Sequence, residues 1–140
     1  MISAVFDCSV VASGLGWRGN PRYCLDLVFA GQVLLCITPE IWQEYDEKIP
    51  LILAGEKRAV DPEKELARLL KLARFAAPAP LGKQHSRDVE DDRYLACALG
   101  AGAKAVVTND RDLLALGKPF GVAMLTPIEF IKLVRSPGMI

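Results

Sequence analysis

Carboxylate side chains recur in this sequence where short apolar runs end. Asp7 comes directly after the run Ile2–Phe6, and Asp110 and Asp112 come shortly after Ala105–Val107. Short apolar runs without strict alternation are typical of strands that are buried on both faces of a parallel sheet. Because ligands bind at the carboxyl ends of such strands, these aspartates are candidates for a binding site. Short acids also cap helices and favour turns, so a purely local role is the alternative.

Two further groups of acids fall in segments that are predicted to be helical. They are three glutamates after the second apolar run and two aspartates in the first turn of a later helix: Glu40, Glu44, Glu47, Asp91 and Asp92. If the first and fourth strands are neighbours, acids from these segments converge. Each close pair of carboxylates then costs on the order of a kcal/mol or more, which calls for a counter-charge. Mg²⁺ or Mn²⁺ would supply it, since these ions take oxygen ligands and can activate a water for attack on phosphorus.

The elements that must position these acids alternate between strand and helix. Apolar runs predict strands at Ile2–Phe6, Val33–Ile37, Ala105–Val107 and 122–125, with the weakest signal at 74–77. Helix-start signals and apolar spacing predict helices at 21–30, 38–48, 62–72, from residue 88 onward, and at 127–134. The glycine-rich stretch before residue 21 is interpreted as a loop. This alternation is typical of a parallel α/β fold with right-handed crossovers.

Two of the predicted helices carry a face suited to burial. Ile41, Tyr45 and Ile49 are spaced by four residues and mark one buried stripe. The helix that starts at Asp88 presents a narrow face of small and apolar residues for close packing on a strand, formed by Leu95, Ala98, Leu99 and Gly102. In the helix at 21–30, Asn20 is the expected N-cap.

Composition bounds the class of protein. A length of 140 residues corresponds to about one domain, so we expect a single domain over 1–140. The 17 basic and 17 acidic side chains balance, so no overall field attracts nucleic acid or a membrane. Without a basic leader or an apolar run of about 20 residues, the chain is predicted to be soluble and cytoplasmic, with no membrane contact. Widely spaced cysteines are expected to be reduced and buried: Cys8, Cys24, Cys36 and Cys97.

Three stretches of the sequence carry acids in an order that is found in a known family. They read AVFDCSVVASGL, ITPEIWQEYDEKI and DVEDDRYLACALGAGAKAVVTNDRDLL, and they follow one another in the family's order between residues 4 and 114. The sequence resembles the PIN-domain nucleases, and most closely the toxin components of type II (VapC-like) toxin–antitoxin systems. The resemblance implies a three-layer α/β/α sandwich with a central, mostly parallel sheet of about five strands.

The resemblance also implies roles for four acids. Asp7, Asp92 and Asp110 would hold Mg²⁺ or Mn²⁺, and Glu44 would bind a second ion or position water. Spacing alone leaves Asp91 open as an alternative to Asp92, although the leucine three residues after Asp92 favours that residue.

Neighbouring residues would have auxiliary roles. Ser9 and Thr108 would orient carboxylates or waters. Asp112 either adds to the metal shell or begins a helical turn, and capping is the better interpretation of Asp88. Cys8 stands where threonine or alanine is more usual in the family, and its side chain is expected to face away from the acid.

Rival chemistries find little support. The sequence has no G-x-S-x-G elbow and no phosphate-binding loop ending in Lys-Ser or Lys-Thr. Aspartate-dependent phosphatases place a second aspartate two residues after the first, where this chain has Ser9.

The implied substrate is RNA, which cations and stacking aromatics usually hold. Candidate contacts near the acids are Trp17, Arg18, Arg87 and Arg111. Arg93 is a further candidate contact, but it is at least as well interpreted as a residue that screens the acids. The resemblance further implies a homodimer and an antitoxin protein that occludes the acidic pocket. The alternative is a catalytically inactive PIN fold that binds RNA or protein.

Overall fold

A parallel sheet of five strands forms the centre of the computed structural model, which describes residues 1–55 and 61–136. Its strand order is β3-β2-β1-β4-β5, and every neighbouring pair is parallel. The strands are β1 (Ile2–Phe6), β2 (Val33–Ile37), β3 (Arg74–Phe75), β4 (Ala105–Val107) and β5 (Ala123–Leu125). The predicted strands are confirmed, although β3 keeps only two residues and β5 begins one residue later than expected.

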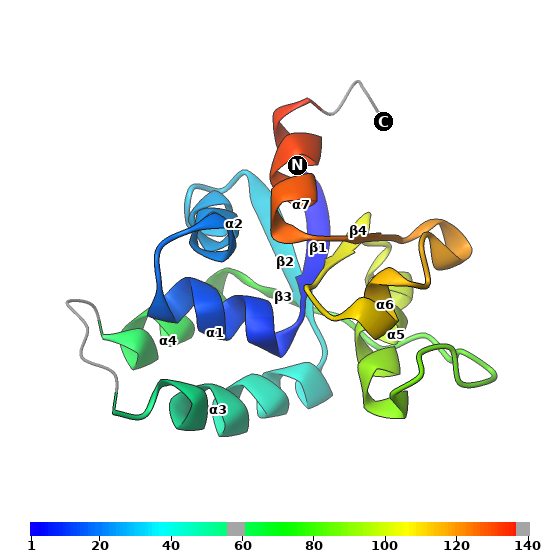
Figure 1. Ribbon diagram of the computed structural model, residues 1–140, viewed down its shortest axis with the longest axis horizontal. Coiled ribbons are helices and arrows are strands. Elements are labelled where there is room, and N and C mark those ends of the chain that lie inside the picture. The colour runs from blue at the N-terminus through cyan, green and yellow to red at the C-terminus, as the bar shows by residue number, and fades with distance from the viewer. Residues whose placement is uncertain (56–60, 137–140) are drawn as a thin grey trace.

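Helices cover both sides of this sheet, which confirms the predicted α/β sandwich. They are α1 (Cys8–Gly16), α2 (Asn20–Phe29), α3 (Pro39–Leu53), α4 (Pro62–Leu72), α5 (Asp92–Ala101), α6 (Arg111–Leu114) and α7 (Pro127–Arg135). Figure 1 shows α1 to α4 on one side of the strands and α5 and α6 on the other. Two 3-10 turns, η1 (Val89–Asp91) and η2 (Pro119–Gly121), precede α5 and β5. In the described ranges, no helix combines the length and apolar character needed to cross a membrane.

The central strand β1 places the first acid at the point where the strand order changes direction. β1 pairs with β2 on one side and with β4 on the other, so that Phe6 is the partner of Val107. The Asp7 amide donates to the Val107 carbonyl at 3.1 Å, which brings the end of β1 beside the end of β4. In open parallel sheets, such a switch point opens the crevice in which ligands bind. The condition set for convergence of the acids, that the first and fourth strands are neighbours, is therefore met.

Helix α1 was not expected, because its glycines favour a loop on propensity alone. Tertiary packing explains why one of them is there. A Cβ at Gly14 would lie 2.6 Å from Cδ1 of Leu25 and 2.9 Å from the Pro21 carbonyl oxygen, so only glycine lets α2 approach this closely. The expected N-cap, Asn20, is instead the first residue of α2, and Gly19 precedes it with φ of 136°.

The remaining helices differ from prediction mainly at their ends. Helix α3 continues beyond residue 48 to Leu53 and contains Pro50, and its predicted stripe is buried. Asp88 caps η1 rather than α5. Gly102 ends α5 in a left-handed conformation, so it is not part of the packing face. The close approach occurs at Gly100 instead, where a Cβ would lie 1.9 Å from the Ala77 carbonyl oxygen. All four cysteines are buried and free, as expected.

Candidate functional site

Hydrogen bonds to both carboxylate oxygens fix the Asp7 side chain at the carboxyl end of β1. One oxygen, Oδ1, accepts from the Val10 amide at 2.8 Å and from the Ser9 hydroxyl at 2.9 Å, so that Asp7 caps α1. The other oxygen accepts from the Thr108 hydroxyl. Only 4% of Asp7 is exposed. The structure thus brings both predicted auxiliary residues, Ser9 and Thr108, into contact with the first acid.

Thr108 also connects Asp7 to Asp110. Its Oγ1 accepts from the Asp110 amide at 2.9 Å while its hydroxyl donates to Asp7. Asp110 in turn caps the short helix α6, because its Oδ1 accepts from the Asp112 amide at 2.8 Å. A helical turn does start here, but Asp110 rather than Asp112 caps it. Asp112 lies within the first turn.

The two neighbouring aspartates 91 and 92 point in different directions. The Asp92 carboxylate accepts from the backbone amides of His85 at 2.9 Å and Ser86 at 2.6 Å, so it is directed at the loop before η1. Asp91 interacts with Asp110 through a hydrogen bond and through charge, and its second oxygen is buried without a hydrogen-bond partner in the described part of the chain. The structure therefore groups Asp91, and not the expected Asp92, with Asp7 and Asp110. We call Asp7, Asp91 and Asp110 the aspartate group.

Burial and mutual repulsion make ionisation difficult within the aspartate group. Burial raises the pKa of Asp7, the hydrogen bonds from Thr108, Val10 and Ser9 oppose that rise, and the charge of Asp110 adds to it. The pKa of Asp91 is raised to about 7, first by burial and then by the charges of Asp110 and Asp88 and the hydrogen bond to Asp110. A nearby cation would relieve both effects.

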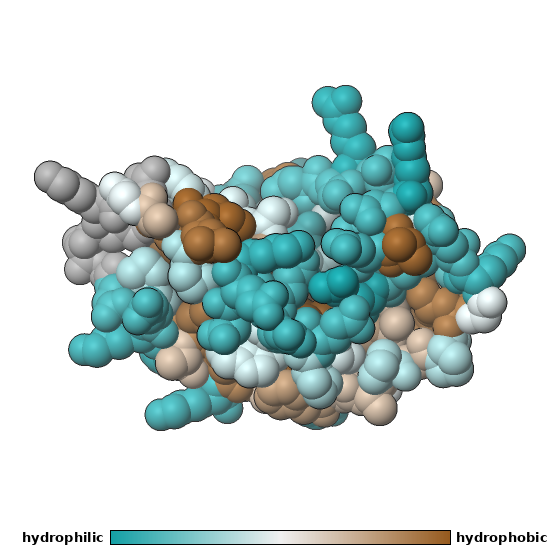
Figure 2. Space-filling model, turned by 90° about the horizontal axis from the view of Figure 1, so that it is seen from below, coloured by the Kyte–Doolittle hydropathy of each residue, from teal (hydrophilic) through white to brown (hydrophobic). Residues whose placement is uncertain are grey.

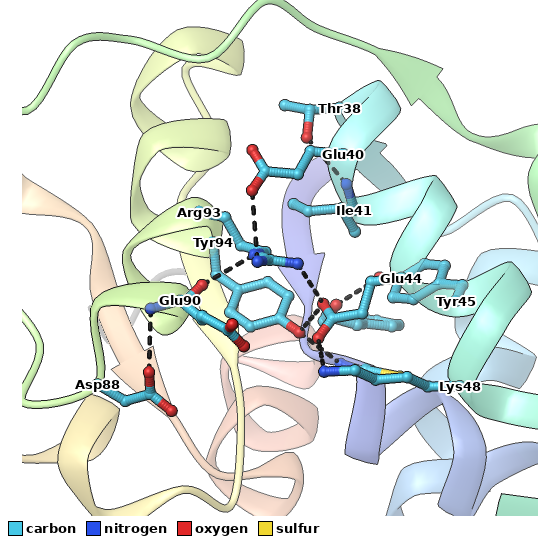
Figure 3. Close-up of polar contacts among 12 residues, drawn as sticks. Thr38, Glu40, Ile41, Glu44, Tyr45, Lys48, Asp88, Glu90, Arg93 and Tyr94 are labelled. Carbon is cyan, nitrogen blue, oxygen red and sulfur yellow. Dashed lines mark hydrogen bonds and ion pairs between the residues drawn. The ribbon is translucent and has the colours of Figure 1, made fainter. Parts of the chain in front are cut away.

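Glu44 lies in a second cluster on the same edge, where α3 faces α5 (Figure 3). The Tyr94 hydroxyl donates to its Oε1, and Lys48 Nζ lies 3.0 Å from its Oε2. Arg93 Nη1 approaches Glu44 Oε1 at 3.7 Å, while Nη2 lies 3.4 Å from Glu40. Glu44, Lys48, Arg93 and Tyr94 form what we call the glutamate cluster. Arg93 here screens acids, which was one of its two interpretations.

The glutamate cluster and its neighbour Tyr45 hold the backbone on both sides of Asp7. The Tyr94 hydroxyl accepts a hydrogen bond from the Cys8 amide at 3.2 Å and donates one to the Glu44 carboxylate. Tyr45, which is completely buried, donates to the Phe6 carbonyl. Burial and the Glu44 charge raise the pKa of the Cys8 thiol to about 12, which keeps it protonated. No sequence signal indicated that tyrosines fix this strand end.

The predicted RNA contacts separate into two places. Arg87 and Arg111 are exposed and adjoin acids in the sequence. Figure 2 looks onto the molecule from below, where hydrophilic side chains lie among several apolar patches. Trp17 and Arg18 lie beyond the far end of α1, about 14 Å from Asp7 along the helix axis. They are not at the aspartate group, because helix α1 occupies Cys8–Gly16 and carries the chain away from Asp7 before Trp17.

The donor types of the aspartate group suit a hard divalent cation. Mg²⁺ and Mn²⁺ take carboxylate oxygens and keep several waters, and the unpartnered buried oxygen of Asp91 is such a donor. Over residues 1–55 and 61–136, no three His, Cys, Asp or Glu side chains are grouped tightly enough to hold a metal as they stand.

Comparisons with known proteins identify the family and the fold. Residues 3–112 match the PIN domain family, so the chain belongs to that family. Its members are generally nucleases that act on nucleic acid and typically use divalent metals. The crystal structure of PAE2754 from Pyrobaculum aerophilum shares the fold, with a TM-score of 0.61 and 19% identity over 96% of this chain and 90% of that one. No match was found among curated proteins.

Proposed function

We propose that this protein is an endoribonuclease that hydrolyses RNA phosphodiester bonds with the help of Mg²⁺ or Mn²⁺. The metal would be held by the aspartate group, with Asp91 in the position first expected of Asp92. When bound, the ion would supply an activated water and neutralise charge on the phosphate. The observation that carries the proposal is the crowding of Asp7, Asp91 and Asp110 at a switch point, with no cation of the chain in contact with them in the described residues.

The surrounding residues position this group. Thr108 holds the Asp7 carboxylate and the Asp110 backbone at once, which fixes the spacing of the two acids. Ser9 orients the other Asp7 oxygen. Glu44 is already neutralised by Lys48 and Arg93, so we assign it to holding α3 against α5 rather than to a second ion. Arg87 and Arg111 would contact phosphates.

The direct test is to titrate Mn²⁺ into the metal-free protein and follow cleavage of a labelled structured RNA. Cleavage should appear with Mn²⁺, disappear with a chelator, and be lost in Asp7→Asn. Asp46→Asn is the matched control, since that residue is exposed on α3 and lies outside the aspartate group. Cleavage without metal, or cleavage that survives Asp7→Asn, would contradict the assignment.

We further propose that the enzyme is the toxin of a toxin–antitoxin pair, acting in the cytoplasm as a homodimer. Family resemblance supports this role, and the buried free cysteines suit a reducing compartment. Expression alone should arrest growth, and co-expression with the product of a neighbouring small open reading frame should restore it. Light scattering would give the oligomeric state.

The alternative is an inactive PIN fold that binds RNA or protein. The tight engagement of Glu44 by its own cations is the observation that favours it. RNA binding without cleavage at any Mn²⁺ concentration would support this alternative.

A further inference from the structure

A groove of about 850 Å³ runs along β5, and none of its lining residues belongs to the aspartate group. It extends from Leu125, at the carboxyl end of β5, to Lys104, which precedes β4 at the opposite edge. Its floor is apolar and includes Ala123 and Leu133. A groove of this size is comparable to sites that bind ligands.

Positive charge is concentrated around this groove although the chain as a whole is neutral. The basic lining residues are Lys104, Lys118, Lys132 and Arg135, and the one acid among the lining residues is Glu129. That carboxylate is occupied, because it accepts from the amide and hydroxyl of Thr126 in the cap of α7. The two basic residues on α7 also complement its helix dipole. The two lysines from other elements have no such local explanation.

An exposed aromatic side chain stands beside the groove. Phe120 is 63% exposed. In the sequence it stands two residues after Lys118 and directly before Gly121, and both of these residues line the groove. Its φ of 53° and ψ of 28° place it in the left-handed region, which a bulky side chain rarely adopts. Such an exposed, strained residue is a functional candidate when the surrounding structure holds it in place.

A chain of contacts connects Phe120 to the aspartate group. The Phe120 ring meets the His85 ring edge to face, with ring centres 5.3 Å apart. The His85 amide donates to Asp92 at 2.9 Å, and Asp92 directly follows Asp91. Asp92 therefore fixes the loop that supports Phe120, which gives this buried acid a role outside metal binding.

We propose that the groove and Phe120 form a second RNA-binding site, which holds the single strand on one side of the scissile bond. A base stacks on Phe120, and phosphates lie against Lys118, Lys132 and Lys104. Sites for single strands combine a positively charged groove with exposed aromatics in this way. The inference rests on the proposed ribonuclease function, since that function supplies the strand.

The test measures binding of fluorescent single-stranded RNAs of 5 and 15 nucleotides to the metal-free full chain by anisotropy. Lys118→Gln combined with Lys132→Gln should weaken binding of the longer RNA roughly tenfold and lower the salt slope by about 1.4. Lys64→Gln combined with Lys71→Gln removes the same charge from exposed positions of α4. This control variant should bind the longer RNA within twofold of the unsubstituted protein and should keep its salt slope. Equal effects of the two double variants would overturn the proposal.

Phe120 is tested in the same assay. Phe120→Ala should weaken binding of the longer RNA about five- to tenfold, and Phe120→Tyr should retain it, because tyrosine still stacks. Thermal melting verifies that both variants fold. If the lysine variant loses binding of poly-glutamate but not of RNA, the groove takes an acidic polypeptide and the proposal is wrong.

Cleavage of the 5-nucleotide RNA with Mn²⁺ tests the second RNA-binding site separately from the proposed ribonuclease function. Groove variants that cleave this short RNA normally, but show a raised KM for the longer one, support the second site. Normal cleavage of both RNAs by the groove variants would overturn the second site and leave the nuclease intact. Groove-dependent binding without any cleavage would contradict the nuclease assignment alone.

Discussion

The aspartate group and the glutamate cluster each hold a buried carboxylate at the same edge of the sheet, Asp7 in one and Glu44 in the other, and they differ in whether that carboxylate has a counter-charge. Glu44 is 9% exposed and is paired with Lys48 and Arg93. Asp7 is 4% exposed, and the charge that affects its ionisation belongs to another acid, Asp110. Buried charges are normally paired or bound to metals. The carboxylate of the glutamate cluster is thus neutralised by side chains of its own chain, whereas the aspartate group would, in the proposed function, be neutralised by a bound cation.

This difference separates residues that stabilise the fold from residues that carry chemistry. Removing Glu44 leaves Lys48 without its carboxylate and Arg93 with Glu40 alone, and should cost stability. Replacing an acid of the aspartate group by asparagine relieves repulsion and keeps a capping oxygen, so it should cost activity more than stability. Substitutions in the two regions should therefore have opposite profiles.

The largest effect is expected at Asp110. Asp110→Asn should lower Mn²⁺-dependent RNA cleavage about a thousandfold, because a metal-binding charge is lost from the site. Asparagine is also a good N-cap, so α6 should remain folded and the melting temperature should change little. Asp112→Asn, in the first turn of the same helix, is the control and should retain activity within tenfold. If both variants lose activity equally, Asp112 belongs to the site.

The next effect concerns the stability supplied by Glu44. Glu44→Ala should lower the free energy of unfolding by about 3 kcal/mol, since it leaves the buried Tyr94 hydroxyl without its acceptor and removes the carboxylate that Lys48 and Arg93 share. Urea denaturation followed by circular dichroism measures this loss. Glu47→Ala, an exposed position on the same helix, should stay within about 0.5 kcal/mol. An unchanged unfolding midpoint for Glu44→Ala, together with lost cleavage, would move Glu44 into the catalytic site.

A smaller loss is expected at Asp92. Asp92→Asn should destabilise the protein by about 2 kcal/mol, because two backbone amides lose a charged acceptor. Hydrogen exchange should accelerate at the amides of His85 and Ser86 before it does so elsewhere. The exposed Asp46 offers a comparison in Asp46→Asn, which should leave those exchange rates unchanged. Complete loss of metal binding in Asp92→Asn would restore the original interpretation of this residue.

Much of the fold could be predicted from the sequence because burial leaves a local trace. The apolar run of β1 and the four-residue spacing of Ile41, Tyr45 and Ile49 both predict burial, and the structure confirms both predictions. Helix α1 could not be predicted in this way. Its Gly14 is needed for close contact with Leu25, a residue of another helix, and such a contact is invisible to local propensity.

The sequence could predict which strands and helices carry the acids of the candidate site, but not the direction in which each side chain points. Asp7 and Asp110 follow strands, so topology alone brings them to one edge. Asp91 and Asp92 lie at the junction of a 3-10 turn with α5, and adjacent residues there project about 100° apart. Only the amides of His85 and Ser86, which engage one of the two carboxylates, decide between them.

The smallest effect, and the one with the opposite sign, is expected at Asp91. Because its folded pKa is raised to about 7, the folded protein retains a proton that the unfolded chain has released, so stability falls as the pH rises from about 4 to 7. Asp91→Asn removes this loss and should raise the melting temperature of the metal-free protein by about 2 to 5 °C at pH 7.5, with little change at pH 4.5. Melting curves at the two pH values, with and without Mn²⁺, measure it. Mn²⁺ should stabilise the unsubstituted protein and not the variant, since only the former binds the ion in its folded state. A variant that melts lower at pH 7.5, or that Mn²⁺ still stabilises, would place Asp91 with the structural acids and return the third metal position to Asp92.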